Sequence, residues 1–317
     1  MEYSGDKLTG QYSKEEGVSV QKKGFRVVVT FISLLVLSAA ILLWGPALLT
    51  PQPRAVHLDM SLSSTVKLRT MSYNIHHGAG MDDSLDLDRI AEVIAKADPD
   101  IVGLQEVDKH FSGRSNWVDQ GKYLAEKLDM HYAYGVNLDY APVSQSPEMA
   151  NRQYGTAILS KFPIETYENV HLDSFEKEQR GLLKATIQVD GVPVHFYTTH
   201  LGLTPEERTL QVQQVMQLVS QQKGPSIIVG DFNAWSLSKA MKPILSEYWD
   251  AFAKKSFANT SNSKIPYQRI DYMLAKADRI QFSSQKVLRT KASDHLPIVA
   301  NITLTVHNAS TLNAFGD

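Results

Sequence analysis

Two polar motifs in the second half of the chain combine residue types that handle phosphate and metal ions. The first, Gly230-Asp231-Phe232-Asn233, directly follows the apolar run 226–229. Such a run is typical of a buried strand, and side chains two residues apart on a strand point the same way. We therefore expect Asp231 and Asn233 to share one site, where the carboxylate binds a cation or a proton and the amide donates to an oxyanion.

The second motif is Ser293-Asp294-His295, which precedes the apolar segment 298–306. Asp and Asn also populate ordinary turns, so neither motif decides the function alone. Further polar residues stand at or near the ends of predicted strands, namely Asn74, Glu106, His200 and Asp271. Because the ends of neighbouring strands meet at one rim of a sheet, this series predicts a shared site.

The composition favours some kinds of chemistry over others. Carboxylate and amide oxygens are the ligands of hard divalent cations, so we expect Mg²⁺ or Mn²⁺. The chain has no Cys, which excludes disulfides and leaves its histidines for proton transfer. It also lacks a His-Glu-x-x-His, a Gly-x-Ser-x-Gly and a P-loop motif. The formal net charge of −2 argues mildly against a long polyanionic substrate, although a local basic patch is compatible with it.

The predicted elements alternate between strands and helices and then become mainly paired strands. Strands are expected at 68–74, 101–106, 155–159, 183–189, 192–198, 226–229, 270–274 and from 298. Helices are expected from Leu87, after the N-cap Asp86, at 120–128, and from a capping box at Thr204 to about Gln222,. Asp190-Gly191 predicts a hairpin turn. This order predicts an α+β sandwich rather than a simple parallel sheet.

The N-terminal part is predicted to be a membrane anchor. Residues 27–50 carry no charged side chain, and about 20 apolar residues suffice to cross a bilayer core. Lys22, Lys23 and Arg26 precede this segment and only Arg54 closely follows it, which places the N-terminus in the cytoplasm and the domain outside. A cleaved signal peptide is the alternative, but its apolar region is usually only about 7–15 residues long.

The expected organisation of the chain has five parts. These are a cytoplasmic tail (1–26), a transmembrane signal-anchor helix (27–50), a linker (51–66), a catalytic domain (67–306) and a C-terminal tail (307–317). The expected localisation is therefore a single-pass protein of the cell membrane with an extracytoplasmic catalytic domain.

The order of the motifs resembles the endonuclease/exonuclease/phosphatase superfamily. The resemblance rests on Tyr73-Asn74, Leu104-Gln105-Glu106-Val107, 154–160, Thr199-His200-Leu201, Gly230-Asp231-Phe232-Asn233, Arg269-Ile270-Asp271-Tyr272 and Ser293-Asp294-His295. The superfamily includes deoxyribonucleases, abasic-site endonucleases, inositol-polyphosphate phosphatases and neutral sphingomyelinases. The match covers 67–306 and implies a four-layered α/β sandwich, with two packed mixed β-sheets flanked by helices and a Mg²⁺-dependent site at one edge.

The resemblance also implies a role for each site residue. Glu106, Asn74 and Asp294 are expected to hold the metal. His295 is expected to be the general base, oriented by Asp271, with Asp231 positioning the attacking water and with Asn233 and His200 holding phosphate oxygens. Arg180 and His77 are further phosphate-binding candidates. The alternatives are a surface acid as the partner of Arg180, a turn role for His76 and His77, and a salt bridge between Asp271 and Arg269.

The substrate is less well defined by the sequence. The stretch 73–78, with 105–108 and 153–155, also resembles the C-terminal domain of eukaryotic proteins linked to GPI-anchor lipid remodelling. The anchor and the acidic balance favour a lipid head group or a small phosphodiester as substrate, with nuclease activity on DNA or RNA as the alternative. A non-catalytic binding module is a further alternative, and the presence of Glu106, Asp231 and His295 argues against it. No protein partner can be inferred.

Overall fold

The computed structural model describes residues 63–277 and 279–307, whose strands form two six-stranded sheets. The first sheet has the strand order β11-β12-β1-β2-β4-β3. Its strands are β1 (Ser63–Asn74), β2 (Ile101–Lys109), β3 (His131–Tyr140), β4 (Arg152–Ser160), β11 (Arg279–Val287) and β12 (Ile298–His307). Because β1 pairs in parallel with β2 and antiparallel with β12, this sheet is mixed and brings both ends of the domain together.

The second sheet has the order β5-β6-β7-β8-β10-β9. Its strands are β5 (Ile164–Leu172), β6 (Arg180–Val189), β7 (Val192–His200), β8 (Ser226–Asp231), β9 (Trp249–Asp250) and β10 (Asp271–Lys276). The pair β7–β8 is parallel and the other pairs are antiparallel, so this sheet is also mixed.

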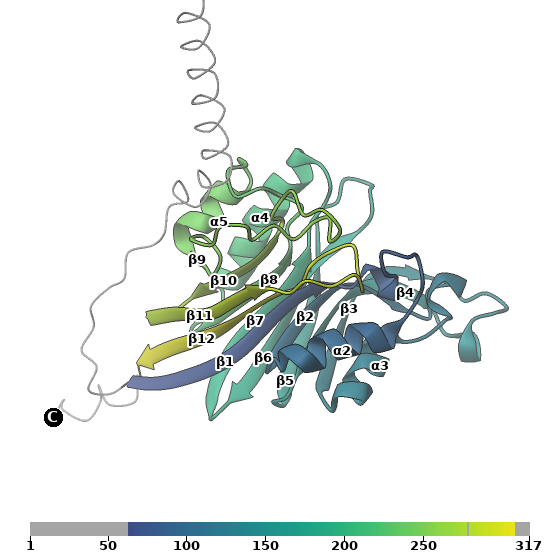
Figure 1. The fold of residues 1–317 in the computed structure, drawn as a ribbon, viewed down its shortest axis with the longest axis horizontal. Helices are drawn as coiled ribbons and strands as arrows, with labels where there is room; N and C mark the ends of the chain where they lie inside the picture. The colour runs from purple at the N-terminus through teal and green to yellow at the C-terminus, as the bar shows by residue number, and fades with distance from the viewer. Residues whose placement is uncertain (1–62, 278, 308–317) are drawn as a thin grey trace, which may run out of the picture. The chain divides into compact units, whose positions relative to one another are not determined.

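Helices cover the outer faces of the two sheets (Figure 1). The first sheet carries α2 (Leu87–Ala97) and α3 (Gln120–Leu128), and the second carries α4 (Pro205–Ser220) and α5 (Met241–Glu247). Each helix pair shares an apolar cluster with its own sheet, and a third cluster lies between the sheets. The four layers are therefore helix, sheet, sheet and helix, as expected from the sequence.

The two sheets approach each other closely at Gly103 on β2. A Cβ atom at this position would lie 2.3 Å from Cγ2 of Val229 on β8. Any other residue at this position would force Val229 or Thr198 on the opposite sheet to move,. The close packing matters because β2 and β8 each carry site residues just beyond this contact, at Glu106 and Asp231.

Local chemistry fixes the ends of several elements as predicted. The side chain of Asp86 accepts a hydrogen bond from the backbone N–H of Arg89 (3.0 Å), which caps α2. Thr204 and Glu207 form the reciprocal capping box that opens α4,. Asp190 (φ 51°) and Gly191 (φ 81°) form the tight turn between β6 and β7, which requires two left-handed residues.

Some elements differ from the expectation. The sequence did not predict the four edge strands β3, β5, β9 and β11, nor the helix α5. The strands β5 and β11 are largely exposed or half-buried, so they lack an apolar pattern, and β9 has only two residues. The strand β1 begins at Ser63, within the expected linker 51–66. The expected anchor at 27–50 lies outside the described residues, as does most of the C-terminal tail. None of the helices in the described part of the chain combines the length and apolarity needed to span a bilayer.

Candidate active site

The register of the second sheet places three predicted site residues at paired positions of three neighbouring strands. His200 at the end of β7 is the partner of Asp231 at the end of β8. Asp271 at the start of β10 is the antiparallel partner of the same Asp231. Side chains at paired positions of neighbouring strands lie about 5 Å apart. The sheet therefore places an imidazole and two carboxylates side by side.

A second imidazole, from His295, lies between the two carboxylates. Its Nδ1 lies 2.9 Å from Oδ2 of Asp271, and its Nε2 lies 3.6 Å from Oδ2 of Asp231. An Nδ1–H that donates to Asp271 leaves Nε2 as the nitrogen that can exchange a proton with another group. All three side chains are buried.

Burial and charge shift the pKa values of this group. Burial acts to lower the pKa of His295, but the carboxylates of Asp271 and Asp231 outweigh it and hold the pKa well above its usual range. Burial raises the pKa of Asp231 to about 7, which His295 partly opposes. The carboxyl of Asp231 therefore titrates near neutral pH beside an imidazole whose pKa is raised, and such a pair can exchange a proton,.

The first sheet contributes an amide and a carboxylate. Asn74, the last residue of β1, donates through Nδ2 to Oε1 of Glu106 (2.9 Å) and to Oδ2 of Asp231 (3.2 Å). Glu106 lies in a β-bulge of β2, where the register to β4 shifts and its own φ is 55°. Bulges commonly redirect a side chain towards an active site. Burial raises the pKa of Glu106, so a cation beside this carboxylate would offset its desolvation.

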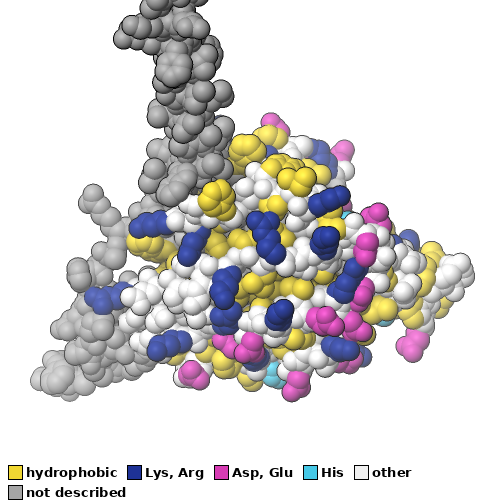
Figure 2. Space-filling view, in the orientation of Figure 1, with side chains coloured by type: hydrophobic (Ala, Val, Ile, Leu, Met, Phe, Trp, Pro, Cys, Tyr) yellow, Lys and Arg dark blue, Asp and Glu magenta, His cyan; other side chains and the backbone are white. Residues whose placement is uncertain are grey.

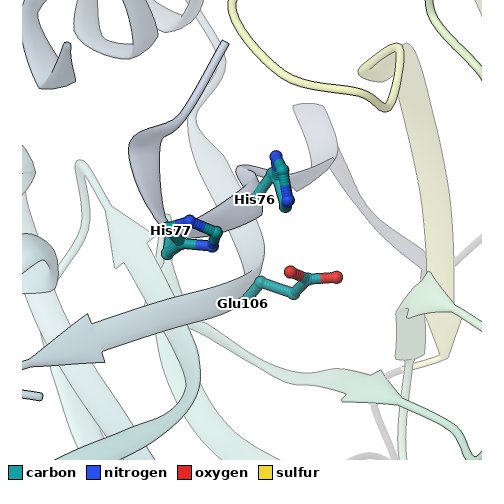
Figure 3. Close-up of side chains that lie close together, drawn as sticks. All are labelled: His76, His77 and Glu106. Atoms are coloured by element: carbon teal, nitrogen blue, oxygen red, sulfur yellow. The ribbon is translucent and has the colours of Figure 1, made fainter. Parts of the chain in front are cut away.

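Two histidines and Asp294 surround Glu106. His76 and His77 belong to the turn after β1 and lie on the same side of the Glu106 side chain (Figure 3). Oδ1 of Asp294 lies 3.9 Å from Nδ1 of His76. Burial, followed by Arg114 and His76, lowers the pKa of His77 to about 4, so its imidazole is neutral at neutral pH. Carboxylate, amide and neutral imidazole are all metal-binding groups, so this part of the site fits a divalent cation.

The opposite part of the site offers donors for an anion. Nη1 of Arg180 donates to Nδ1 of His200 (3.1 Å), while Nδ2 of Asn233 lies 3.1 Å from Nε2 of the same ring. Burial, together with Arg180 and His295, holds the pKa of His200 well below its usual range. A neutral imidazole accepts at only one nitrogen, and the two donors have further acceptors in the protein, the backbone oxygen of Leu201 for Asn233 (2.9 Å) and Glu178 for Arg180 (2.8 Å). Nε of Arg180 is buried and has no partner in the described part of the chain.

These residues surround one cavity of about 350 Å³. Its wall also includes six residues that the sequence did not suggest as site residues, namely Phe111, Arg114, Leu138, Tyr154, Glu178 and Leu203. Arg114 donates through Nε and Nη2 to the buried carboxylate of Asp108 (2.9 and 2.7 Å) and stacks on Phe111. The segment around Arg114 has no strand or helix pattern, so the sequence carried no signal that it reaches the site.

The structure brings the predicted site residues together. Glu106, His77, Arg180, His200, Asp231, Asn233 and His295 line the cavity, and Asn74, Asp271 and Asp294 are adjacent to lining residues. The alternative ion pair between Asp271 and Arg269 is not formed, because Arg269 binds Asp250 through two hydrogen bonds (3.1 and 2.7 Å). Arg180 was expected to bind either a phosphate or an acidic side chain. In the protein without a ligand, its Nη1 lies 2.8 Å from Oε1 of Glu178. The chemical roles of these residues remain predictions.

Among enzyme classes, this arrangement fits the metal-dependent phosphoric ester hydrolases. Residues 71–295 match the Endonuclease/Exonuclease/phosphatase family. Because this match covers most of the chain, the protein belongs to that family. The predicted family and enzyme class are therefore confirmed.

Relatives from several bacteria share the sequence or the fold. The chain is 31% identical over 254 residues to the uncharacterized protein YbhP of Escherichia coli K12, an alignment that covers 74% of this chain and 96% of YbhP. The crystal structure of an endonuclease/exonuclease/phosphatase from Beutenbergia cavernae has 26% identity and a TM-score of 0.65, covering 75% of this chain and 72% of that one. A mannosyl-6-phosphatase of Bacteroides thetaiotaomicron has 19% identity and a TM-score of 0.59, covering 74% and 99%, and shows the shared fold.

Proposed function

We propose that the protein hydrolyses a phosphate ester by in-line attack of water, with Mg²⁺ as cofactor and Mn²⁺ as a possible substitute. The observation that carries this proposal is the position of the His295 imidazole between two buried carboxylates, with Oδ2 of Asp231 3.6 Å from Nε2. Asn74 joins the same Asp231 to Glu106. A proton-transfer group and a cation-binding carboxylate thus belong to one connected site.

The proton-transfer step would use His295 and Asp231 together. Asp271 accepts from Nδ1–H and fixes the ring, so Nε2 is the nitrogen that takes the proton of the attacking water,. Asp231 orients that water, and its pKa of about 7 lets it share the proton with His295 at neutral pH,. Because the pKa of His295 is raised, the pair rather than the imidazole alone is the base in this proposal.

The phosphate would lie between the two sheets. Asn233, His200 and Arg180 supply the donors for its non-bridging oxygens, and the unpartnered Nε of Arg180 is one of them. Glu106, with Asn74 and Asp294, would hold the cation. When bound, a divalent cation neutralises charge on the phosphoryl group and on the leaving oxygen.

The proposed substrate is a lipid head group or a small phosphodiester. The cavity of about 350 Å³ is large enough for one head group or one small phosphodiester. The apolar side chains of Leu203, in the cavity wall, and Trp235, two residues after Asn233, are largely exposed, and such side chains suit an acyl chain. On the face in Figure 2, Lys and Arg are scattered over the middle and upper part. They do not form one continuous patch on this face. We keep nuclease activity as the competing function.

We further propose that the N-terminal segment anchors the protein in the cell membrane with the catalytic domain outside. The support is the uncharged run 27–50 and the basic residues that precede it,. Protease added to spheroplasts should then cleave the domain and leave residues 1–26 protected. A trimmed, soluble product in the medium would contradict the anchor.

The test of the enzymatic proposal is a substrate panel with the full-length protein. Sphingomyelin, phosphatidylinositol, bis-p-nitrophenyl phosphate, plasmid DNA and RNA are each assayed with Mg²⁺ and with excess EDTA. We expect hydrolysis of a lipid or of the small diester, complete loss in EDTA, and a parallel loss of metal binding and activity in Glu106→Gln. Full activity in EDTA would refute the metal requirement, and preferred cleavage of DNA or RNA would refute the lipid assignment.

A further inference from the structure

We propose that His76, His77 and Glu106 form a nitrogen-containing metal position that binds a transition-metal ion of the Mn²⁺, Co²⁺ or Zn²⁺ group more tightly than Mg²⁺. Each of the three side chains offers one ligand atom, and these atoms lie within 4.8 Å of one another. Figure 3 shows both imidazole rings on one side of the Glu106 carboxylate. Ligand atoms about 2.1 Å from a shared ion lie about 3–3.5 Å apart, so small side-chain rotations would complete the position.

The hydrogen bonds around these side chains leave metal-binding atoms free. Nδ1 of His76 lies 3.3 Å from the backbone oxygen of Ala79. An imidazole that donates to a carbonyl through one nitrogen presents the lone pair of the other, which is the usual arrangement of a metal-bound histidine. Oε1 of Glu106 accepts from Asn74. Within residues 63–277 and 279–307, the other carboxylate oxygen accepts no hydrogen bond and remains available.

The backbone directs both imidazoles to the cavity. His76 (φ 46°) and His77 (φ 43°) are consecutive residues in the left-handed region, which residues other than Gly rarely adopt. Several hydrogen bonds hold this turn, among them those from the N–H of Gly78 to the oxygen of Ile75 (2.8 Å) and from Nε2 of Gln120 to the oxygen of His77 (2.6 Å). Both side chains then line the same cavity as Glu106. The turn is therefore fixed independently of any ligand.

The ligand types determine which ion this position prefers. Oxygen-only sites suit Mg²⁺, whereas imidazole ligands favour Zn²⁺, Co²⁺ and other transition metals. The position shares Glu106 with the proposed catalytic cation, but metal binding can be measured without a substrate. Failure of this inference would therefore leave the proposed hydrolysis standing, and absence of hydrolysis would leave this inference standing.

The experiment compares the full-length wild type with the double variant His76→Asn/His77→Asn. Asn is chosen because it adopts the left-handed conformation more readily than most residues and so preserves the turn. Co²⁺ is titrated while its visible absorption is followed, and Zn²⁺ and Mg²⁺ affinities are measured by calorimetry. His131→Asn, at an exposed position on β3, is the matched control. Circular dichroism and the melting temperature establish that each variant is folded.

We expect the wild type to bind one Co²⁺ with absorption bands typical of nitrogen ligation. The double variant should lose these bands and bind Zn²⁺ more than about 100-fold more weakly, because loss of a direct ligand exceeds the cost of losing an outer partner. Its Mg²⁺ affinity should change far less. Equal Zn²⁺ affinity in the wild type and the folded double variant would overturn the proposal. An equal loss of Zn²⁺ affinity in His131→Asn would also overturn it, because it would indicate adventitious binding. So would a double variant that binds metal normally but has a raised KM, because the two histidines would then contact the substrate.

Discussion

The two sides of the cavity are built in different ways. Asp231, Asp271 and His295 are buried, and sheet register sets the positions of the two carboxylates. His76, His77 and Glu106 are half-buried and depend on a turn and a bulge with positive φ. Register holds groups at fixed spacing away from water, which suits proton transfer. A turn exposes its side chains to solvent, which suits an ion that must enter and leave. The two sides therefore differ in burial: the acid–base side is buried, and the proposed metal side is partly open to solvent.

The largest effect is expected from breaking the buried side. His295→Ala should lower kcat by about 100-fold to 10⁴-fold, because general base catalysis contributes about that much. KM should change little, since the proton moves only in the transition state. Steady-state kinetics on the substrate found in the panel would measure both. His295→Gln, which keeps a side chain in the buried space, is the matched variant. If activity falls only in proportion to the folded protein, His295 is structural.

A smaller effect is expected when the orientation of His295 is changed. Asp271→Asn should lower kcat by roughly 10-fold, less than His295→Ala, because Nε2 remains and only its positioning and basicity are altered. Asp271 helps to raise the pKa of His295. Activity that requires neutral His295 therefore rises as pH increases through that pKa, and in Asp271→Asn the rise should occur at lower pH. A pH profile with its ascending limb unmoved would assign that limb to another group.

The smallest effect concerns stability and sharpens the contrast in burial. The pKa of Asp231 is raised by burial from 3.8 to about 7. A group with a raised folded pKa stabilises the protein fully below its unfolded pKa, and this contribution is lost as pH rises through the folded value. As pH rises from about 4 to 7, the melting temperature of the metal-free wild type should therefore fall relative to that of Asp231→Asn. Differential scanning calorimetry in EDTA would measure it, and a difference that stays constant with pH would contradict the shift.

The sequence predicted the residue types of the site but not their mutual geometry. Asp231 was found because polar residues follow an apolar run, and Asn74 because it ends a predicted strand; both signals are local. The pairing of Asp231 with both His200 and Asp271 is a matter of register, which depends on contacts between distant segments,. The partner of Arg269, Asp250, lies in the two-residue strand β9, too short for any periodicity. Its identity therefore emerged only from the fold.

The burial of the site residues could not be predicted from the sequence. Substitution of a surface side chain usually changes stability by about 0.5 kcal/mol or less. Asp271 is 2% and His295 7% exposed. Removing one member of a buried charged group leaves the others uncompensated, which costs more than a surface change, about 3–5 kcal/mol for a buried pair. The sequence around His295 does not reveal its burial, because a distant segment covers it. This segment is the loop before β10, where Ser261 forms a β-bridge to His295.

The amide of Asn74 spans the interface between the two halves of the sandwich. It donates to Glu106 in its own sheet and to Asp231 in the other. A displacement of one sheet along the other by a single residue, about 3.3 Å, would pull these acceptors apart. Catalysis therefore depends on the relative position of the two sheets. If heating weakens the apolar contacts between the sheets before the strands unfold, activity should be lost at a lower temperature than secondary structure.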